Sequence, residues 1–135
     1  MSQANGEAFK RVIEAYNRGD VEALLDELDT EIEWRPVLPV VLGGDSTVYR
    51  GHDGVRQLLR DLDEVLAERQ MDFSEIRQAG DHVVALGSLR IRGKSSGALS
   101  ESPFGCVAEL KNGKAIRIQT YLDPSDALEH LGRVS

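Results

Sequence analysis

The fold is decided by one stretch, PFGCVAELKNGKAIRIQTYLD, residues 103–123, in which Asn112-Gly113 separates two apolar-rich runs. A two-residue turn with positive φ at both positions suits this dipeptide, and its twist matches that of the strands it joins. The register that follows pairs Glu109 with Ile116 and Val107 with Ile118. One hairpin face then carries Val107, Ile116, Ile118 and Thr120, and the other carries Cys106, Ala108, Arg117, Gln119 and Tyr121. Neither face is wholly polar, so we expect both to be covered.

Upstream of the hairpin, the chain begins with two amphipathic patterns of helical period. The apolar positions are Phe9, Val12, Ile13 and Tyr16 in the first pattern, and Val21, Leu24, Leu25 and Leu28 in the second. Spacings of three and four residues place each set on one helix face. Gly19 suits the left-handed residue just past a helix, and Asp20 offers an N-cap carboxylate. Two short helices joined at Gly19-Asp20 are therefore predicted.

A half-buried strand is predicted over residues 30–35, because Ile32 and Trp34 alternate with charged residues. Residues 36–49, PVLPVVLGGDSTVY, are irregular by their two prolines and Gly-Gly pair, yet apolar before Gly43. An apolar loop must cover something, so this segment is interpreted as a lid or rim over a cavity.

The longest helix is predicted after Gly51-His52-Asp53-Gly54, with apolar positions Val55, Leu58, Leu59, Leu62, Val65 and Leu66. Strands are predicted over residues 71–79 and 82–92, with a bulge in the first because Ile76 is out of phase with Phe73. Residues 93–102 form a polar connection to the hairpin. A terminal helix starts at Asp123-Pro124, where Asp suits the N-cap and Pro the first helical position.

This order of elements predicts a single α+β domain over residues 1–135, in which a curved antiparallel sheet wraps around N-terminal helices. A curved sheet leaves a pocket wherever the helices fail to fill its concave side.

Charge and composition narrow the classes of partner. The net charge of −7 argues against nucleic acid, whose phosphates need clustered Lys and Arg. No apolar run of about 18 residues is present, so no membrane partner is expected. The N-terminal residues lack the apolar core of a signal peptide, and Cys106 is the only cysteine, which suits a reducing cytoplasm. The histidines have no metal-ligand spacing, so no metal is expected. The sequence has no dinucleotide-binding fingerprint, and no cofactor is expected.

The same order of elements, with EIEWRP, YRGHDGV, the Asn-Gly hairpin and YLDPSDALEHLG, resembles the nuclear transport factor 2-like superfamily. Within that superfamily the chain is most similar to SnoaL-like proteins, whose namesake is a polyketide cyclase. The resemblance covers nearly the whole chain. It implies a cone-shaped α+β barrel with a deep apolar cavity, and often a homodimer packed through the outer face of the sheet.

The functional residues of relatives carry over unevenly. The resemblance places Val12, Trp34 and Val107 where ketosteroid isomerase has its tyrosine and two aspartates, so that isomerase mechanism is not expected here. The catalytic aspartate of the cyclase corresponds to Asp123, counted back from Leu131-Gly132. Asp123 is therefore a candidate general base, and its other interpretation is the cap of the terminal helix.

His52 and Tyr49 are the candidates for polarising a substrate oxygen. His52 lies at a helix entrance beside Asp53, and an imidazole near neutrality can transfer protons. Its alternative role is that of a capping or solvated residue. His82 and His130 are expected to face water.

The candidate ligand-binding residues are Trp34, Arg90, Ile118, Thr120 and Tyr121. A tryptophan often lines a cavity wall, and an inward Arg90 would bind an anionic or carbonyl group. Core packing is the alternative for Trp34, solvent exposure is the alternative for Arg90, and strand alternation points Tyr121 outward.

Two functional hypotheses remain open. The first is a small hydrophobic, carbonyl-bearing ligand in an apolar pocket, with proton transfer of cyclase, isomerase or hydrolase type. The second is a binding or dimerisation module without chemistry. A homodimer is predicted separately. Cys106, Ala108 and Tyr121 share one face of the hairpin, and these side chains are not expected all to remain exposed to solvent.

Overall fold

The structure, a computed structural model, describes residues 4–36 and 48–134. Helices and strands follow in this order: α1 (Ala4–Arg18), α2 (Val21–Asp26), β1 (Leu28–Arg35), β2 (Tyr49–Arg50), α4 (Gly51–Val65), β3 (Leu66–Ala79), β4 (His82–Gly93), β5 (Leu99–Lys111), β6 (Lys114–Tyr121) and α5 (Pro124–Val134). The predicted lid falls mostly on residues 37–47, which lie outside the described residues. The α+β fold is confirmed.

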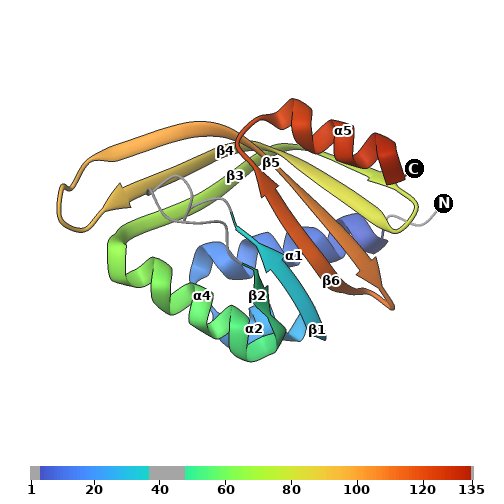
Figure 1. Ribbon diagram of the computed structural model, residues 1–135, viewed down its shortest axis with the longest axis horizontal. Helices are drawn as coiled ribbons and strands as arrows, with labels where there is room; N and C mark the ends of the chain where they lie inside the picture. The colour runs from blue at the N-terminus through green and yellow to red at the C-terminus, as the bar shows by residue number, and fades with distance from the viewer. Residues whose placement is uncertain (1–3, 37–47, 135) are drawn as a thin grey trace.

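The described strands form one curved, unclosed sheet in the order β2-β1-β6-β5-β4-β3 (Figure 1). Neighbouring strands are antiparallel except β1 and β6, which run parallel. The sheet therefore differs from the wholly antiparallel one predicted. The parallel pair arises because the chain passes through β2, α4, β3, β4 and β5 before it returns to lie beside β1.

Helices cover both sides of this sheet. Figure 1 shows α1, α2 and α4 on its concave side, which we call the inner face, and α5 across the opposite, outer face. The large inner core includes Phe9, Leu58 and Phe104, whereas a small outer core joins Val84 and Val107 to α5. Strand alternation sends neighbouring side chains to opposite cores.

Local signals in the sequence set several boundaries correctly. Asn112 and Gly113 both have positive φ, 54° and 80°, as the predicted turn requires. Asp20 Oδ1 accepts a hydrogen bond from Ala23 N at 3.2 Å, and Gly19 has a φ of 69°. The bulge predicted in β3 lies between Phe73 and Glu75.

The two predicted pairs of the hairpin, Glu109 with Ile116 and Val107 with Ile118, are both wrong. A bulge between Glu109 and Leu110 leaves Ile116 unpaired, so that Glu109 faces Arg117 and Ala108 faces Ile118. A slip of one residue exchanges the faces of a strand. Cys106 and Ala108 consequently lie in the inner core of the same chain. These two residues therefore do not contribute to the outer face of the sheet, where a second subunit was expected to pack. The homodimer stays a prediction.

At one residue of the free edge strand β3, a side chain pairs with the backbone. Asn17, at the end of α1, donates from Nδ2 to the carbonyl of Met71 at 2.8 Å and accepts from the amide of Met71 at 2.9 Å. Its amide thus satisfies both backbone groups of one edge residue, as a neighbouring strand would. This contact fixes the end of α1 against the sheet.

Candidate functional site

The inner face retains a small apolar gap, which we call the inner hollow. It is lined by Tyr16, Trp34, Pro36, Leu58, Leu62, Met71, Leu89 and Thr120. Its free volume is about 20 Å³, roughly the space that one water molecule needs. The deep cavity implied by the resemblance is thus nearly filled by side chains, and a ligand would have to move its walls apart.

Two aromatic rings form one wall of the inner hollow. Trp34 and Tyr16 have ring centroids 6.0 Å apart with a 34° tilt, and both side chains are buried. Burial raises the pKa of Tyr16 to about 12, although the nearby guanidinium of Arg69 opposes the shift. The Tyr16 hydroxyl is therefore protonated at neutral pH and able to donate a hydrogen bond. The sequence assigned Tyr16 only to the core, because its helical spacing carries no other signal.

A second hydroxyl group comes from β6. Thr120 lines the inner hollow, and its Oγ1 lies 3.7 Å from Cys106 Sγ on β5. Burial raises the pKa of Cys106 to about 12, so the thiol is neutral. Ile118, also predicted to bind ligand, is buried in the inner core but does not line the hollow.

Tyr49 lies beside Trp34, because the two residues are direct partners in the pairing of β1 with β2. Its hydroxyl donates to Asp61 Oδ2 on α4 at 2.7 Å. Desolvation and this carboxylate raise the pKa of Tyr49 to about 12. Asp61 was not singled out in the sequence, where it resembles any charged residue on the exposed face of a helix.

His52 has a structural contact at the start of α4. Its Nε2 lies 3.0 Å from the carbonyl oxygen of Leu28, and the adjacent Asp53 is exposed and pairs with Arg56 instead. The imidazole joins α4 to the beginning of β1. It does not line the inner hollow.

Asp123 is an exposed N-cap residue of α5. Its Oδ1 accepts from the backbone amide of Ser125 at 2.9 Å and from the hydroxyl of the same residue at 2.7 Å. These hydrogen bonds hold the pKa of Asp123 below its usual value. A general base needs a raised pKa and a pocket, so this geometry favours the helix-cap interpretation. The structure does not bring Asp123, His52 and Tyr49 together.

The outer face carries a polar cluster that the sequence did not reveal, formed by Tyr121, His130, His82, Glu109 and Arg117. The Tyr121 hydroxyl lies 2.8 Å from Nδ1 of His130, and the rings of His130 and His82 are 6.3 Å apart. Glu109 Oε1 lies 3.8 Å from His82 Nε2 and 2.6 Å from Arg117 Nη1. Both histidines were expected to face water, but α5 folds over β4 and β5 and makes them half-buried neighbours.

This cluster predicts that the folded state loses stability as the pH falls through about 6.5. Burial lowers the pKa of His130, and the positive charges of Arg133 and His82 act in the same direction. The unfolded chain then binds a proton at a pH where the folded protein does not, so the free energy of unfolding decreases. Urea unfolding between about pH 7.5 and 5.5 measures this slope.

The control is His130→Asn, whose amide oxygen can still accept from Tyr121 but does not titrate. This variant should show a flatter profile over the same range. An unchanged slope would assign the pH dependence to other groups.

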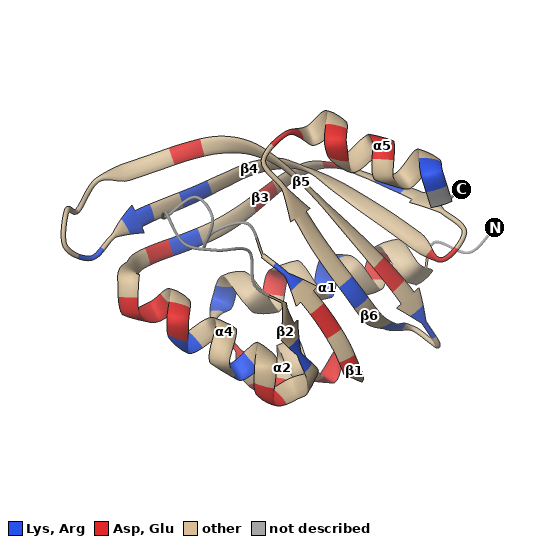
Figure 2. Ribbon diagram, in the orientation of Figure 1, with Lys and Arg blue, Asp and Glu red and all other residues tan. Residues whose placement is uncertain are grey.

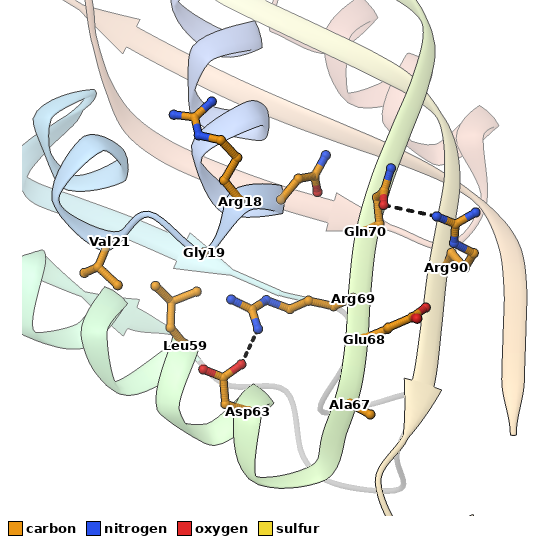
Figure 3. Close-up of a pocket in the computed structure, with 11 residues that line it drawn as sticks. Arg18, Gly19, Val21, Leu59, Asp63, Ala67, Glu68, Arg69, Gln70 and Arg90 are labelled. Carbon is orange, nitrogen blue, oxygen red and sulfur yellow. Dashed lines mark hydrogen bonds and ion pairs between the residues drawn. The ribbon is translucent and has the colours of Figure 1, made fainter. Parts of the chain in front are cut away.

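A much larger cleft follows the free edge of β3, and we call it the edge groove. Its volume is about 490 Å³, and it is lined by Asn17, Arg18, Gly19, Val21, Leu59, Asp63, Ala67, Glu68, Arg69, Gln70 and Arg90. Figure 3 shows Arg69 reaching from β3 across the groove to its ion-pair partner Asp63 on α4. Basic and acidic residues are interspersed where α4 meets β3 (Figure 2).

Arg90 belongs to this groove and not to the inner hollow. Its neighbours Leu89 and Ile91 face the inner core, so Arg90 points to the outer face, where Nη2 donates to Gln70 Oε1 at 3.1 Å. Tyr121 likewise packs on the outer face with the small outer core. Of the five predicted ligand-binding residues, Trp34 and Thr120 share the inner hollow.

Within residues 4–36 and 48–134, no three His, Cys, Asp or Glu side chains are grouped so that they could hold a metal ion. Over the same residues, no helix combines the length and apolar character needed to cross a membrane.

Comparison with known proteins places these features in a wider group. The family model of the SnoaL-like domain matches residues 9–118. No curated protein matches the sequence.

Solved structures match over nearly the whole chain. A protein of unknown function with the nuclear transport factor 2-like fold, from Burkholderia pseudomallei, is 25% identical, with a TM-score of 0.78 and coverage of 96% of this chain and 97% of that one. TerC, co-crystallised with polyporic acid, is 24% identical, with a TM-score of 0.78 and coverage of 96% and 98%. A protein with a ketosteroid isomerase-like fold from Catenulispora acidiphila, in complex with trimethylamine, is 14% identical, with a TM-score of 0.75 and coverage of 93% and 92%.

Proposed function

Since the chain belongs to the SnoaL-like domain family, we propose that it binds a small, largely apolar molecule at the inner hollow. The ligand would lie against Trp34 and Tyr16 and contact the apolar side chains of α4, β3 and β4. The observation that carries this proposal is an apolar lining that includes two residues with a hydroxyl group, Tyr16 and Thr120. Binding sites for small molecules typically combine an apolar wall with a few placed polar groups.

The chemistry of the ligand follows from these hydroxyl groups. The protonated Tyr16 hydroxyl suits a carbonyl oxygen, which accepts a hydrogen bond but cannot donate one. The complex of TerC with polyporic acid supports a small organic ligand in this fold. A hydrophobic molecule with one carbonyl group is therefore the class of ligand we expect.

A binding module is favoured over an enzyme. Among the described residues that line the inner hollow there is no carboxylate and no imidazole, so the hollow itself supplies no general base. Tyr49 is the predicted catalytic residue closest to it in the fold, as the strand partner of Trp34, and its proton is directed to Asp61. Asp123 lies exposed at the start of α5.

Trp34 fluorescence tests the proposal directly, because the chain contains one tryptophan. Titration with 1-tetralone should change the emission and saturate, and tetralin, the matched hydrocarbon, should bind more weakly. Tyr16→Phe should remove about 0.5–1.5 kcal/mol of the preference for the ketone, the contribution of one hydrogen bond.

Tyr121→Phe makes the same chemical change on the outer face, and Asp123→Asn alters the exposed cap. Both controls should bind 1-tetralone as the unmodified protein does. The absence of a saturable change in emission with either compound would contradict binding at the inner hollow.

A further inference from the structure

The edge groove carries more positive than negative charge in a protein that is acidic as a whole. Arg18, Arg69 and Arg90 line it against Asp63 and Glu68, whereas the net charge of the chain is −7. Both acidic residues already face arginines. Asp63 pairs with Arg69, and Oε1 of Glu68 lies 3.8 Å from Nε of Arg92. Of the arginines, Arg18 has its Nη2 4.0 Å from Oδ2 of Asp20, whereas Arg90 contacts the neutral amide of Gln70. The arginines of the groove would therefore attract an added anion.

Arg69 has a buried N–H group that lacks a hydrogen-bond acceptor among the described residues. Its side chain is only 12% exposed, its guanidinium carbon lies 5.0 Å from the ring centroid of Tyr16, and its Nε is buried without a hydrogen-bond partner among the described residues. A buried donor of a charged group without an acceptor is costly, and such groups are rare in native proteins. The ring face of Tyr16 accepts part of the charge but leaves this N–H unsatisfied.

The carboxylate that now pairs with Arg69 is easily displaced. Asp63 is 63% exposed, and an ion pair with one partner in solvent contributes little to stability. It contacts one nitrogen, Nη1, whereas the guanidinium fork can hold a carboxylate through two. Asp63 thus marks the position that an incoming carboxylate would take.

The groove also offers apolar contact and room. Figure 3 shows Leu59 next to the guanidinium of Arg69, with Val21 on the far side of Leu59. The volume of about 490 Å³ falls in the range typical of sites for small organic molecules.

We propose that the edge groove binds the carboxylate of a small, partly apolar organic acid, with Arg69 as the anchoring residue and Asp63 as the group that the acid displaces. The lining of this site has no residue in common with that of the inner hollow. The guanidinium of Arg69 nevertheless lies against the ring of Tyr16, which lines the hollow.

The test is an NMR titration of the full chain with 4-phenylbutyrate and, in parallel, with its uncharged primary amide. The acid should shift backbone signals of Gly19, Ala67 and Gln70, and it should bind about tenfold more tightly than the amide, equivalent to one charge-assisted contact. The indole signal of Trp34 should not move, which separates this site from the inner hollow.

Two substitutions should act in opposite directions. Arg69→Met should abolish the preference for the acid while affinity for the amide stays the same. Asp63→Asn should raise affinity for the acid about threefold, because it removes a weak competitor. Arg69→Lys, which keeps the charge but loses the fork, should retain part of the preference and serves if Arg69→Met does not fold.

Matched controls carry the same charge changes elsewhere. Arg77→Met lies further along β3, and Glu129→Gln lies on α5; both should behave as the unmodified protein. The proposal is overturned if neither compound binds, if acid and amide bind equally, if Arg69→Met keeps the preference, or if the shifts map to Trp34.

Discussion

Truncation of Trp34 to alanine is expected to lower the free energy of unfolding by about 3–5 kcal/mol. Trp34 is 3% exposed, and its ring is tilted against that of Tyr16, with ring centroids 6.0 Å apart. Its removal would enlarge the inner hollow from about 20 Å³ to a cavity that the flanking strands β2 and β6 hold open. Urea unfolding followed by circular dichroism measures the loss, because the fluorescence of the chain disappears with its tryptophan.

Trp34→Phe is the control, since it keeps an aromatic ring in place and should cost less. Free indole should restore part of the stability of Trp34→Ala by filling the cavity, with a gain of about 2.7 kcal/mol when its concentration is 100 times Kd. A loss below about 1 kcal/mol would mean that the walls collapse around the missing ring. In that case the side chains around the inner hollow rearrange too easily for its shape to select a ligand.

Substitution of Gly87 by alanine should destabilise the protein by about 3 kcal/mol or more, at the upper end for overpacking. Gly87 faces Phe73 on β3 and Phe104 on β5. A Cβ at this position would lie 1.9 Å from the carbonyl oxygen of Asp72 and 2.6 Å from Cα of Phe73. These are backbone atoms next to the bulge in β3, so no side-chain rotation relieves the contact. Thermal or urea unfolding checks the loss.

Gly132→Ala provides the opposite case. It lies in α5, and an added Cβ would meet nothing within 4 Å, so alanine should stabilise the helix by about 0.5–1 kcal/mol. Equal stability of Gly87→Ala and the unmodified protein would show that β3 shifts freely against β4. The edge groove, which β3 borders, would then have no fixed shape.

The two cavities suggest a division of roles within one domain. The inner hollow is apolar and nearly closed, whereas the edge groove is open, polar and positively charged. A ligand bound as proposed would have to move side chains apart in the first, whereas in the second it would displace a surface carboxylate. Measurements on Trp34 and on Arg69 therefore report on separate events.

The candidate site was only partly predictable. Trp34 was recognised because alternation in β1 places it inward, and it lines the inner hollow together with Thr120. Arg69 and Asp61 gave no signal, since each lies in a stretch of mixed charge where the sequence does not show which side chain meets a partner. Arg69 faces Asp63 only because β3 folds back along α4, and Asp61 meets Tyr49 only because β2 pairs with β1.

The sequence by itself determined the helices and the hairpin turn, although Leu28 and Leu66, predicted on helices, begin strands and β5 begins at Leu99, inside the predicted connection. The apolar spacing of α1 and α4, the N-cap at Asp20 and the positive φ values at Asn112-Gly113 are local properties, set by residues a few positions apart. Tertiary structure alone decided the bulge at Ile116, the inner position of Cys106 and the partner of each charged side chain. These features depend on how segments far apart in the chain pack together. A bulge changes few local contacts, yet it sends every later side chain of a strand to the other face.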